Sequence, residues 1–384
     1  MKIFTRSLCF TALLTLCIED GFCQEYRLSI DMRIPFMAGL VPINSIPTAY
    51  YELYLTNFSS DSMIIGKVEI FDPSDSSIVA SLSKDDLAAR YAVIGVPQKA
   101  GENTGKSMLG PGNSGVIYLE LALRKDKLPL QLGHRVSIEI VKDSSKSMLQ
   151  VEGAFVQLPQ KLPVILGRPL AGGPWAVVYD PSWPRGHRRV LYTVDGRARI
   201  PGRYAIDFIK LDSQGRWANG DDNLTKNWYG YGVDVLAVAN GTIVAARDDF
   251  VESATLSEHP PCPPAKATGN YIAIDIGNNH IAFYEHLQPG SIRVKPGQIV
   301  KKGQVIAAIG FTGQTTGPHL HFHVADRNSP LGAEGIPFVF ERFTVLGTYI
   351  DFEKFGKEPW TPANPIQSSP VTAEHPAPKS VIRF

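Results

Sequence analysis

Histidine spacing is the feature of this sequence that points most directly to chemistry. The chain has nine histidines, and five of them fall within residues 280–323. In residues 317–324 imidazoles alternate with apolar side chains, so in a β-strand His319, His321 and His323 would share one face. Imidazoles grouped in this way are suited to bind a divalent metal or to carry protons. The alternative is a solvated polar face.

Length, composition and charge limit the class of protein. The chain has 384 residues, of which 44% are hydrophobic and 20% charged, so we expect two or three globular domains and exclude a disordered or collagen-like chain. There are 38 Lys plus Arg against 37 Asp plus Glu. A balance this close gives no overall field that would attract nucleic acid, and we expect no nucleic-acid partner.

The first residues predict export. Lys2 and Arg6 precede an apolar run over residues 8–18, and Gly21 and Cys23 place small residues before a cut at residue 24, which is the pattern of a secretory signal peptide. The alternative is an anchored N-terminus, but the run is too short to cross a bilayer comfortably. We therefore expect no membrane span in the mature chain and a periplasmic or extracellular location in a bacterial envelope. Cys262, the one cysteine left, is interpreted as an incidental thiol.

The rest of the chain predicts an all-β protein of two domains. Short β-branched and aromatic runs separated by turn residues predict a β-sandwich over residues 24–158. Residues 159–185 are rich in Pro and Gly and are interpreted as a linker, and a second β-rich domain follows over 186–350. Residues 351–384 contain many prolines and few large apolar residues, which predicts a disordered tail.

A family resemblance appears in the second domain. The stretch 310–323 reads GFTGQTTGPHLHFH, and it resembles the C-terminal motif of the LytM-type, or M23, zinc metallopeptidases, which cleave peptidoglycan cross-links. Residues 284–287, Tyr-Glu-His-Leu, are similar to the family's Tyr-x-His-Leu, and segments 269–277 and 294–306 agree in order and spacing. The resemblance covers about residues 203–325 and implies a LytM-like fold of the barrel-sandwich type for 186–350.

The resemblance also implies a zinc site. Asp207 matches the family's metal-binding aspartate, and His321 matches the second histidine of its His-x-His ligand motif. His286 and His319 match two histidines that do not bind the metal but activate water and stabilise the transition state. The cofactor implied is Zn²⁺, which lowers the pKa of a bound water to about 7.

One position departs from the family pattern. The first ligand is a histidine four residues before the aspartate, and here Arg203 stands there. Arginine stays protonated and offers no lone pair to a metal, and it would place a positive charge beside any ion. Two replacements are available, His187, which we favour, and His323, although side chains two residues apart on a strand are separated by about 6.6 Å.

These observations predict an exported zinc metalloendopeptidase that hydrolyses stem or cross-bridge peptides of peptidoglycan. The N-terminal domain would position the enzyme or recognise a protein partner. The alternative is a degenerate, non-catalytic LytM-like module that binds or activates another cell-wall hydrolase, and the departure at Arg203 is what motivates it.

Overall fold

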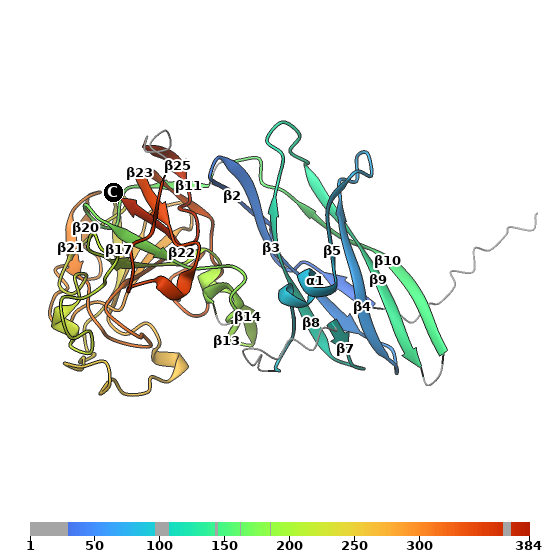
Figure 1. Ribbon diagram of the computed structural model, residues 1–384, viewed down its shortest axis with the longest axis horizontal. Coiled ribbons are helices and arrows are strands. Elements are labelled where there is room, and N and C mark those ends of the chain that lie inside the picture. Colours follow the sequence, from blue (N-terminus) through green and yellow to red (C-terminus); the bar gives the residue numbers. More distant parts are fainter. Residues whose placement is uncertain (1–29, 97–106, 143–144, 162, 185, 364–369) are drawn as a thin grey trace, which may run out of the picture.

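The computed structural model describes residues 30–96, 107–142, 145–161, 163–184, 186–363 and 370–384, and it is almost entirely β-structure. The predicted signal peptide, residues 1–23, lies outside these ranges. Two bodies stand side by side, an N-terminal one in blue and green and a C-terminal one in green to red (Figure 1). The all-β prediction is therefore confirmed.

The N-terminal body is a sandwich of two sheets, each five-stranded within the described residues. Residues from both sheets, such as Leu53 and Ile138, meet in one hydrophobic core, because alternate side chains of a strand point to the same face. The first sheet has the order β1 (Ile30–Arg33), β3 (Ile46–Asn57), β8 (Ser114–Ala122), β6 (Tyr91–Val93), with β2 (Gly39–Ile43) beside β3. The second has the order β10 (Ser145–Gln157), β9 (Gln131–Lys142), β4 (Ser62–Phe71), β5 (Ile78–Ser83), with β7 (Ser107–Leu109) beside β4. Helix α1 (Lys84–Arg90) follows β5.

A long sheet organises the C-terminal body. Its strand order is β11 (Val164–Leu166), β23 (Phe338–Thr348), β26 (Ser380–Arg383), β12 (Trp175–Val178), β15 (Ile206–Lys210), β22 (Leu320–Ala325), β19 (Ile281–Glu285), β18 (Tyr271–Asp275), β17 (Gly241–Arg247), β20 (Ile299–Val300). Strands β24 (Thr361–Pro362) and β25 (Val371–Glu374) pair with β23. Separate two-stranded pairs are β13 (Tyr192–Val194) with β14 (Arg197–Arg199), and β16 (Asp234–Leu236) with β21 (Val305–Ala308). Short 3-10 turns are η1 (His187–Arg189), η2 (Pro201–Tyr204), η3 (Thr225–Asn227), η4 (Pro264–Lys266) and η5 (Phe352–Lys354).

The predicted linker over 159–185 is wrong in its described residues. The segment contains β11 and β12, and Leu166, Leu170 and Trp175 are fully buried in the core of the C-terminal body. Its prolines and glycines correctly indicate irregular turns. They do not reveal that the short apolar runs between them pair with residues 29 or more positions away in the sequence.

The predicted disordered tail is also wrong where residues 351–384 are described. Strand β26 lies between β23 and β12, and Val381 and Ile382 are fully buried. His375 is buried as well, and its Nδ1 donates a hydrogen bond to the carbonyl oxygen of Phe338 at 3.0 Å. A few apolar residues are enough here, because they complete a sheet that already exists.

Strand β3 connects the two bodies, because it is buried on both faces. Tyr51 and Leu53 enter the sandwich core, whereas Tyr50 belongs to the hydrophobic cluster of the C-terminal body and meets Tyr204 edge-on, with 5.5 Å between ring centroids. Glu52 shares the face of Tyr50, since it lies two residues further along the strand. The outer face of the first sheet is therefore the contact surface between the bodies (Figure 1).

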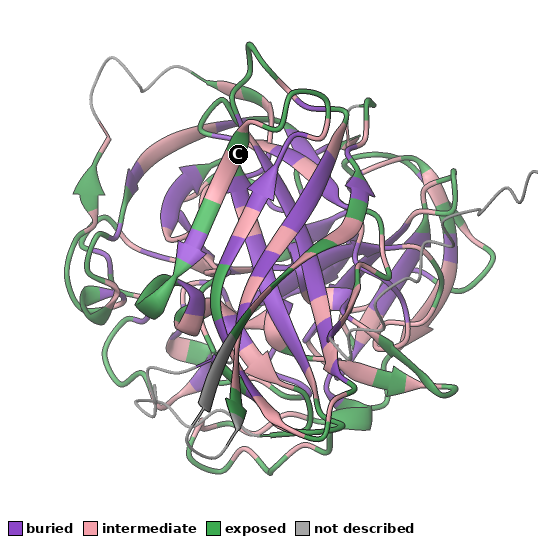
Figure 2. Cartoon of the chain, turned by 90° about the vertical axis from the view of Figure 1, so that its right-hand side faces the viewer, coloured by how far each residue is buried: buried purple, intermediate pink, exposed green. Residues whose placement is uncertain are grey.

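Burial follows the strands in both bodies. Figure 2 shows buried residues running along the strands, with exposed residues gathered in loops and at the ends of strands. No helix in the described part of the chain is both long and apolar enough to cross a membrane.

Candidate active site

A row of polar side chains crosses three neighbouring strands of the C-terminal sheet. Asp207 of β15 is directly opposite His321 of β22, which is directly opposite Glu285 of β19. Residues opposite each other in antiparallel strands point to the same face. The next residue along β22, Phe322, enters the core on the other face, so the alternation predicted from the sequence is observed.

Three of the predicted residues come together in a set that could hold a metal ion. His187 Nε2 lies 3.2 Å from Asp207 Oδ2, and His321 Nδ1 lies 2.9 Å from Asp207 Oδ1. The ligand atoms of all three residues lie within 4.8 Å of one another. Three donors of a tetrahedral zinc ion are about 3.3 Å apart, and two imidazoles with one carboxylate form a donor set that zinc accepts in catalytic sites. The residues present fit a zinc ion.

His187 reaches this set from outside the sheet. It begins η1, which contacts η2, and η2 leads directly into β15 and Asp207. Gly202 in η2 lies under the histidine: a Cβ atom there would stand 2.8 Å from the Cβ of His187 and 3.0 Å from its carbonyl oxygen. The absence of a side chain at Gly202 is therefore what lets the two turns approach closely.

The hydrogen bonds of His286 and His319 define which ring nitrogen carries a proton. His286 Nδ1 is 2.7 Å from the carbonyl oxygen of Thr312, and His319 Nδ1 is 2.8 Å from that of Gly317. A carbonyl oxygen only accepts, so both Nδ1 atoms must donate. This leaves Nε2 of each ring for the reaction. The two rings are 4.7 Å apart, and His319 Nε2 is 3.4 Å from Asp207 Oδ1.

The backbone at His286 adopts an unusual conformation. Its φ is +64°, in the left-handed region that residues other than glycine seldom occupy. The position is held by two backbone hydrogen bonds, from His286 N to Thr268 O at 3.1 Å and from Gly310 N to His286 O at 3.0 Å. Backbone strain that the surrounding structure maintains is frequent at functional positions.

Burial and neighbouring charges shift the pKa values of the site. Burial opposes ionisation of Asp207, but the imidazoles of His187 and His319 outweigh it and hold the pKa of Asp207 well below its ordinary value. Burial also disfavours the cationic form of His319, yet the Asp207 carboxylate raises the pKa of His319 overall. Burial, with repulsion from His319 and His321, lowers the pKa of His286 well below its ordinary value.

These side chains line one open cleft. It has a volume of about 360 Å³, and its walls include His187, Asp207, His286, His319 and His321. The structure therefore brings together these five residues that the sequence singled out, although they come from four separate segments of the chain. A cleft of this size is within the range of ligand-binding sites.

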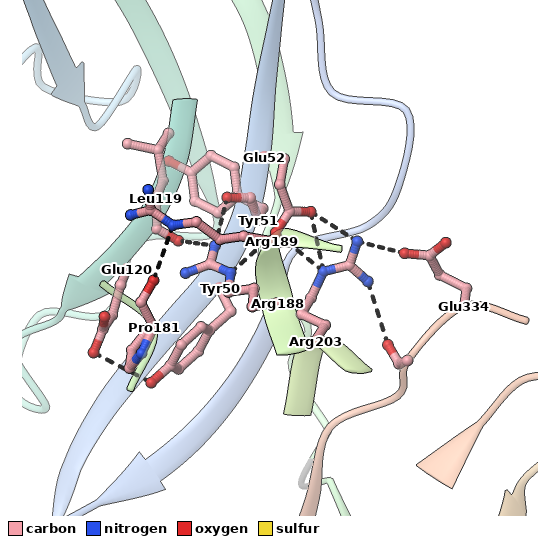
Figure 3. Close-up of polar contacts among 11 residues, drawn as sticks. Tyr50, Tyr51, Glu52, Leu119, Glu120, Pro181, Arg188, Arg189, Arg203 and Glu334 are labelled. Atoms are coloured by element: carbon pink, nitrogen blue, oxygen red, sulfur yellow. Dashed lines mark hydrogen bonds and ion pairs between the residues drawn. The ribbon is translucent and has the colours of Figure 1, made fainter. Parts of the chain in front are cut away.

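Arg203 does not stand beside this cluster, which corrects our expectation of a positive charge next to the metal. Its guanidinium is buried against Glu52 of the N-terminal sandwich, with 2.7 Å from Nη2 to Oε2, and it also forms an ion pair with Glu334 (Figure 3). The structural role of Arg203 is thus to connect the two bodies.

His323, the second possible replacement ligand, has different neighbours. Its ring stacks on Phe283, with 4.7 Å between centroids, and its Nδ1 is 3.8 Å from Glu285 Oε1. His323, His321 and Glu285 form a second group whose ligand atoms lie close together. Burial, assisted by the Asp207 carboxylate, raises the pKa of Glu285 to about 8. A carboxyl group must lose its proton before it binds a metal, which favours the group of His187, Asp207 and His321 over this one.

Sequence reasoning missed two buried carboxyl residues, Glu285 and Glu52. Glu285 stands in the Tyr-Glu-His-Leu motif of residues 284–287, but the sequence pattern predicts no role for it. Glu52 is the one charged residue in the run 49–55, AYYELYL. A charge inside a run that is otherwise apolar or aromatic is the signal that could have identified it, because a buried charge requires a partner.

Comparison with known proteins finds a family match within the C-terminal body. Residues 229–332 match the model of peptidase family M23. The matched region includes His286, His319, His321 and His323, and it begins after His187, Arg203 and Asp207. The match covers about a quarter of the chain, and three of the residues discussed above lie before it.

Several relatives in this region are enzymes by name. Peptidoglycan DD-endopeptidase ShyA of Vibrio cholerae is 46% identical over 98 residues, which are 26% of this chain and 21% of the relative. Peptidoglycan DD-endopeptidase ShyB of the same organism is 37% identical over 115 residues, or 30% and 22% of the two chains. The chain thus spans only about a fifth of the length of these relatives.

Among solved structures, the catalytic domain of lysostaphin from Staphylococcus simulans is similar with 24% identity and a TM-score of 0.24, and the match covers 43% of this chain and 88% of that domain.

Proposed function

We propose that this protein is an exported zinc metalloendopeptidase that hydrolyses peptide bonds in peptidoglycan, in its stem or cross-bridge peptides. The observation that carries the proposal is the meeting of His187 with Asp207 and His321, at 3.2 Å and 2.9 Å from the two carboxylate oxygens. His187 would thus be the third ligand, in place of the histidine that the family pattern has at position 203. The M23 match and the endopeptidase relatives support the substrate class.

The chain's own residues then have distinct tasks. His187, Asp207 and His321 would hold the zinc ion, which when bound acidifies a water molecule and polarises the scissile carbonyl. His286 Nε2 is free to accept a proton, since its Nδ1 donates to Thr312. His319 Nε2 borders the same cleft. Because Nδ1 already donates to Gly317, Nε2 would donate a hydrogen bond to the oxygen that gains charge when the ring carries a proton on both nitrogens.

The experiment measures zinc content and hydrolysis in the same preparations. We expect about one zinc per chain in the protein starting at residue 24, and release of peptides from purified peptidoglycan. His286→Ala and His319→Ala should keep the zinc and lower the rate by about 10²–10⁴-fold, the usual contribution of a positioned proton carrier.

The matched control is His280→Ala. His280 lies in the turn between β18 and β19, where its N–H donates to Gly277, and it does not line the cleft; its replacement should leave the rate unchanged. A zinc-loaded protein whose hydrolysis does not depend on His286 or His319 would contradict the enzyme proposal and favour a non-catalytic module that binds another hydrolase.

A further inference from the structure

Two arginines that flank the proposed metal ligands in sequence are anchored in the other body. Arg188 immediately follows His187, and Arg203 precedes Asp207 by four residues. Both side chains converge on Glu52 of β3 (Figure 3). The distances are 3.1 Å from Arg188 Nε to Glu52 Oε1, and 3.0 Å and 2.7 Å from Arg203 Nε and Nη2 to Glu52 Oε2.

The backbone of the sandwich completes this junction. Arg188 Nη2 also donates to the carbonyl oxygens of Tyr51 in β3, at 2.9 Å, and of Leu119 in β8, at 2.6 Å. Its guanidinium is therefore held between two strands of the N-terminal sheet. Arg203 reaches in the other direction, to Glu334 and to the carbonyl oxygen of Gly335. Among the described residues, Glu52 is the side chain to which both arginines donate hydrogen bonds.

Burial makes the shared carboxylate indispensable to this arrangement. Glu52 is 2% exposed, Arg188 is 4% and Arg203 is 6%. Buried charges are screened only weakly, because little water surrounds them. Without Glu52, the two guanidinium groups would remain buried close together and repel each other. We expect one of them to turn away, and the short turn that carries it to move with it.

That movement would reach the proposed ligands directly. Arg188 is part of η1, which begins at His187, and Arg203 is part of η2, which contacts η1 through Gly202. We propose that Glu52, a residue of the N-terminal sandwich, is a positioning residue for the zinc centre of the C-terminal body, because it fixes the two turns that deliver His187 and Asp207. The inference rests on the function proposed above.

The test is zinc affinity in the full chain, measured by competition with a chromophoric chelator well below the unfolding temperature. Glu52→Gln should weaken zinc binding by about 10–100-fold, as is usual when a group that orients a metal ligand is lost. Thermal unfolding of the metal-free protein is recorded in parallel, to separate a loss of stability from a loss of affinity.

The matched control is Glu374→Gln. Glu374 of β25 also joins the two bodies, since its carboxylate accepts hydrogen bonds from Ser45 N at 3.1 Å and Ser45 Oγ at 3.0 Å. In contrast to Glu52, its described hydrogen bonds go to Ser45 and not to the arginines of η1 and η2. The zinc affinity of the Glu374→Gln protein should remain within about twofold of the wild type. If Glu52→Gln does not fold, Glu52→Asp, which keeps the charge but is too short to reach both arginines, is judged by the same affinity criterion.

The outcomes are distinct. Unchanged zinc affinity in the Glu52 variant that folds overturns the positioning role, even if that variant unfolds at a lower temperature. A wild-type chain that binds no zinc overturns the proposed function, and this inference with it.

Discussion

Asp207 and His321 lie directly opposite each other on adjacent antiparallel strands, with 2.9 Å between Oδ1 and Nδ1. The sheet therefore fixes these two groups before any ion arrives. The third group, His187, stands on a short turn outside the sheet, and its position depends on contacts that are easier to disturb.

The first prediction concerns the identity of the third ligand. Loss of a hydrogen bond that orients a metal ligand usually weakens metal binding by about 10–100-fold. His187→Ala should weaken zinc binding by more than this, because it removes a coordinating nitrogen. His323→Ala, the matched change on β22, should retain about one zinc per chain. The measurement is zinc content after dialysis against a competing chelator, and the reverse order of the two variants would assign the ligand to His323.

The second prediction uses the close approach of η1 and η2. A methyl group at Gly202 would lie 2.8 Å from His187 Cβ, so Gly202→Ala must push the histidine away from Asp207. We expect about tenfold weaker zinc binding or more. Gly230→Ala is the control, since a Cβ there meets its nearest neighbour at an ordinary 3.6 Å. Equal zinc affinities for the two variants would contradict the prediction, because they would show that η1 accommodates the added methyl group without moving His187 away from Asp207.

The third prediction concerns the C-terminal strand. Ile382 is fully buried in β26, so Ile382→Ala should lower the free energy of unfolding by about 2–5 kcal/mol through lost burial and a cavity. Ile350 is 79% exposed, and Ile350→Ala should change it by less than about 0.5 kcal/mol. Urea unfolding measures both, and similar small effects would mean that β26 contributes little to the sheet.

The fourth prediction is a pH dependence of stability in metal-free protein. Burial lowers the pKa of His375 from 6.5 to about 4. The unfolded chain therefore takes up this proton first, and stability that is complete above pH 6.5 is lost as the pH falls towards 4. A plot of the free energy of unfolding against pH should be less steep for His375→Asn in that interval, by up to about 1.4 kcal/mol per pH unit. If the free energy of unfolding of the wild type and of His375→Asn changed with pH in the same way, His375 would not be a cause of the loss of stability in acid.

Part of the candidate site could be predicted from the sequence because Asp207 and His321 lie in regular strands and because His286 and His319 stand in motifs of recognisable spacing. The alternation in 317–324 correctly places His319, His321 and His323 on one face, and the family resemblance points to Asp207. These predictions depend on local periodicity and on motif spacing, which a single sequence displays directly.

The rest depended on contacts between distant segments. Trp175 and Ile382 are neighbours across β12 and β26, although 207 residues separate them, and no local pattern reveals such a pair. The same holds for Arg203, whose partner Glu52 is 151 residues away. Its departure from the family pattern indicated a missing ligand, while the structure shows a connection between two bodies.

The place of β26 in the sheet sets an order for folding. Strand β12 pairs with β26 on one side and with β15, the strand of Asp207, on the other. During synthesis β12 and β15 emerge long before residues 380–383, and until then the outer edge of β12 has no partner. The sheet that carries Asp207 can thus be completed only when β26 has been made, and pairing across so long a stretch of chain is slow. An unpaired edge of this kind is open to association with other chains, so the protein is most vulnerable to aggregation in the interval before β26 is added.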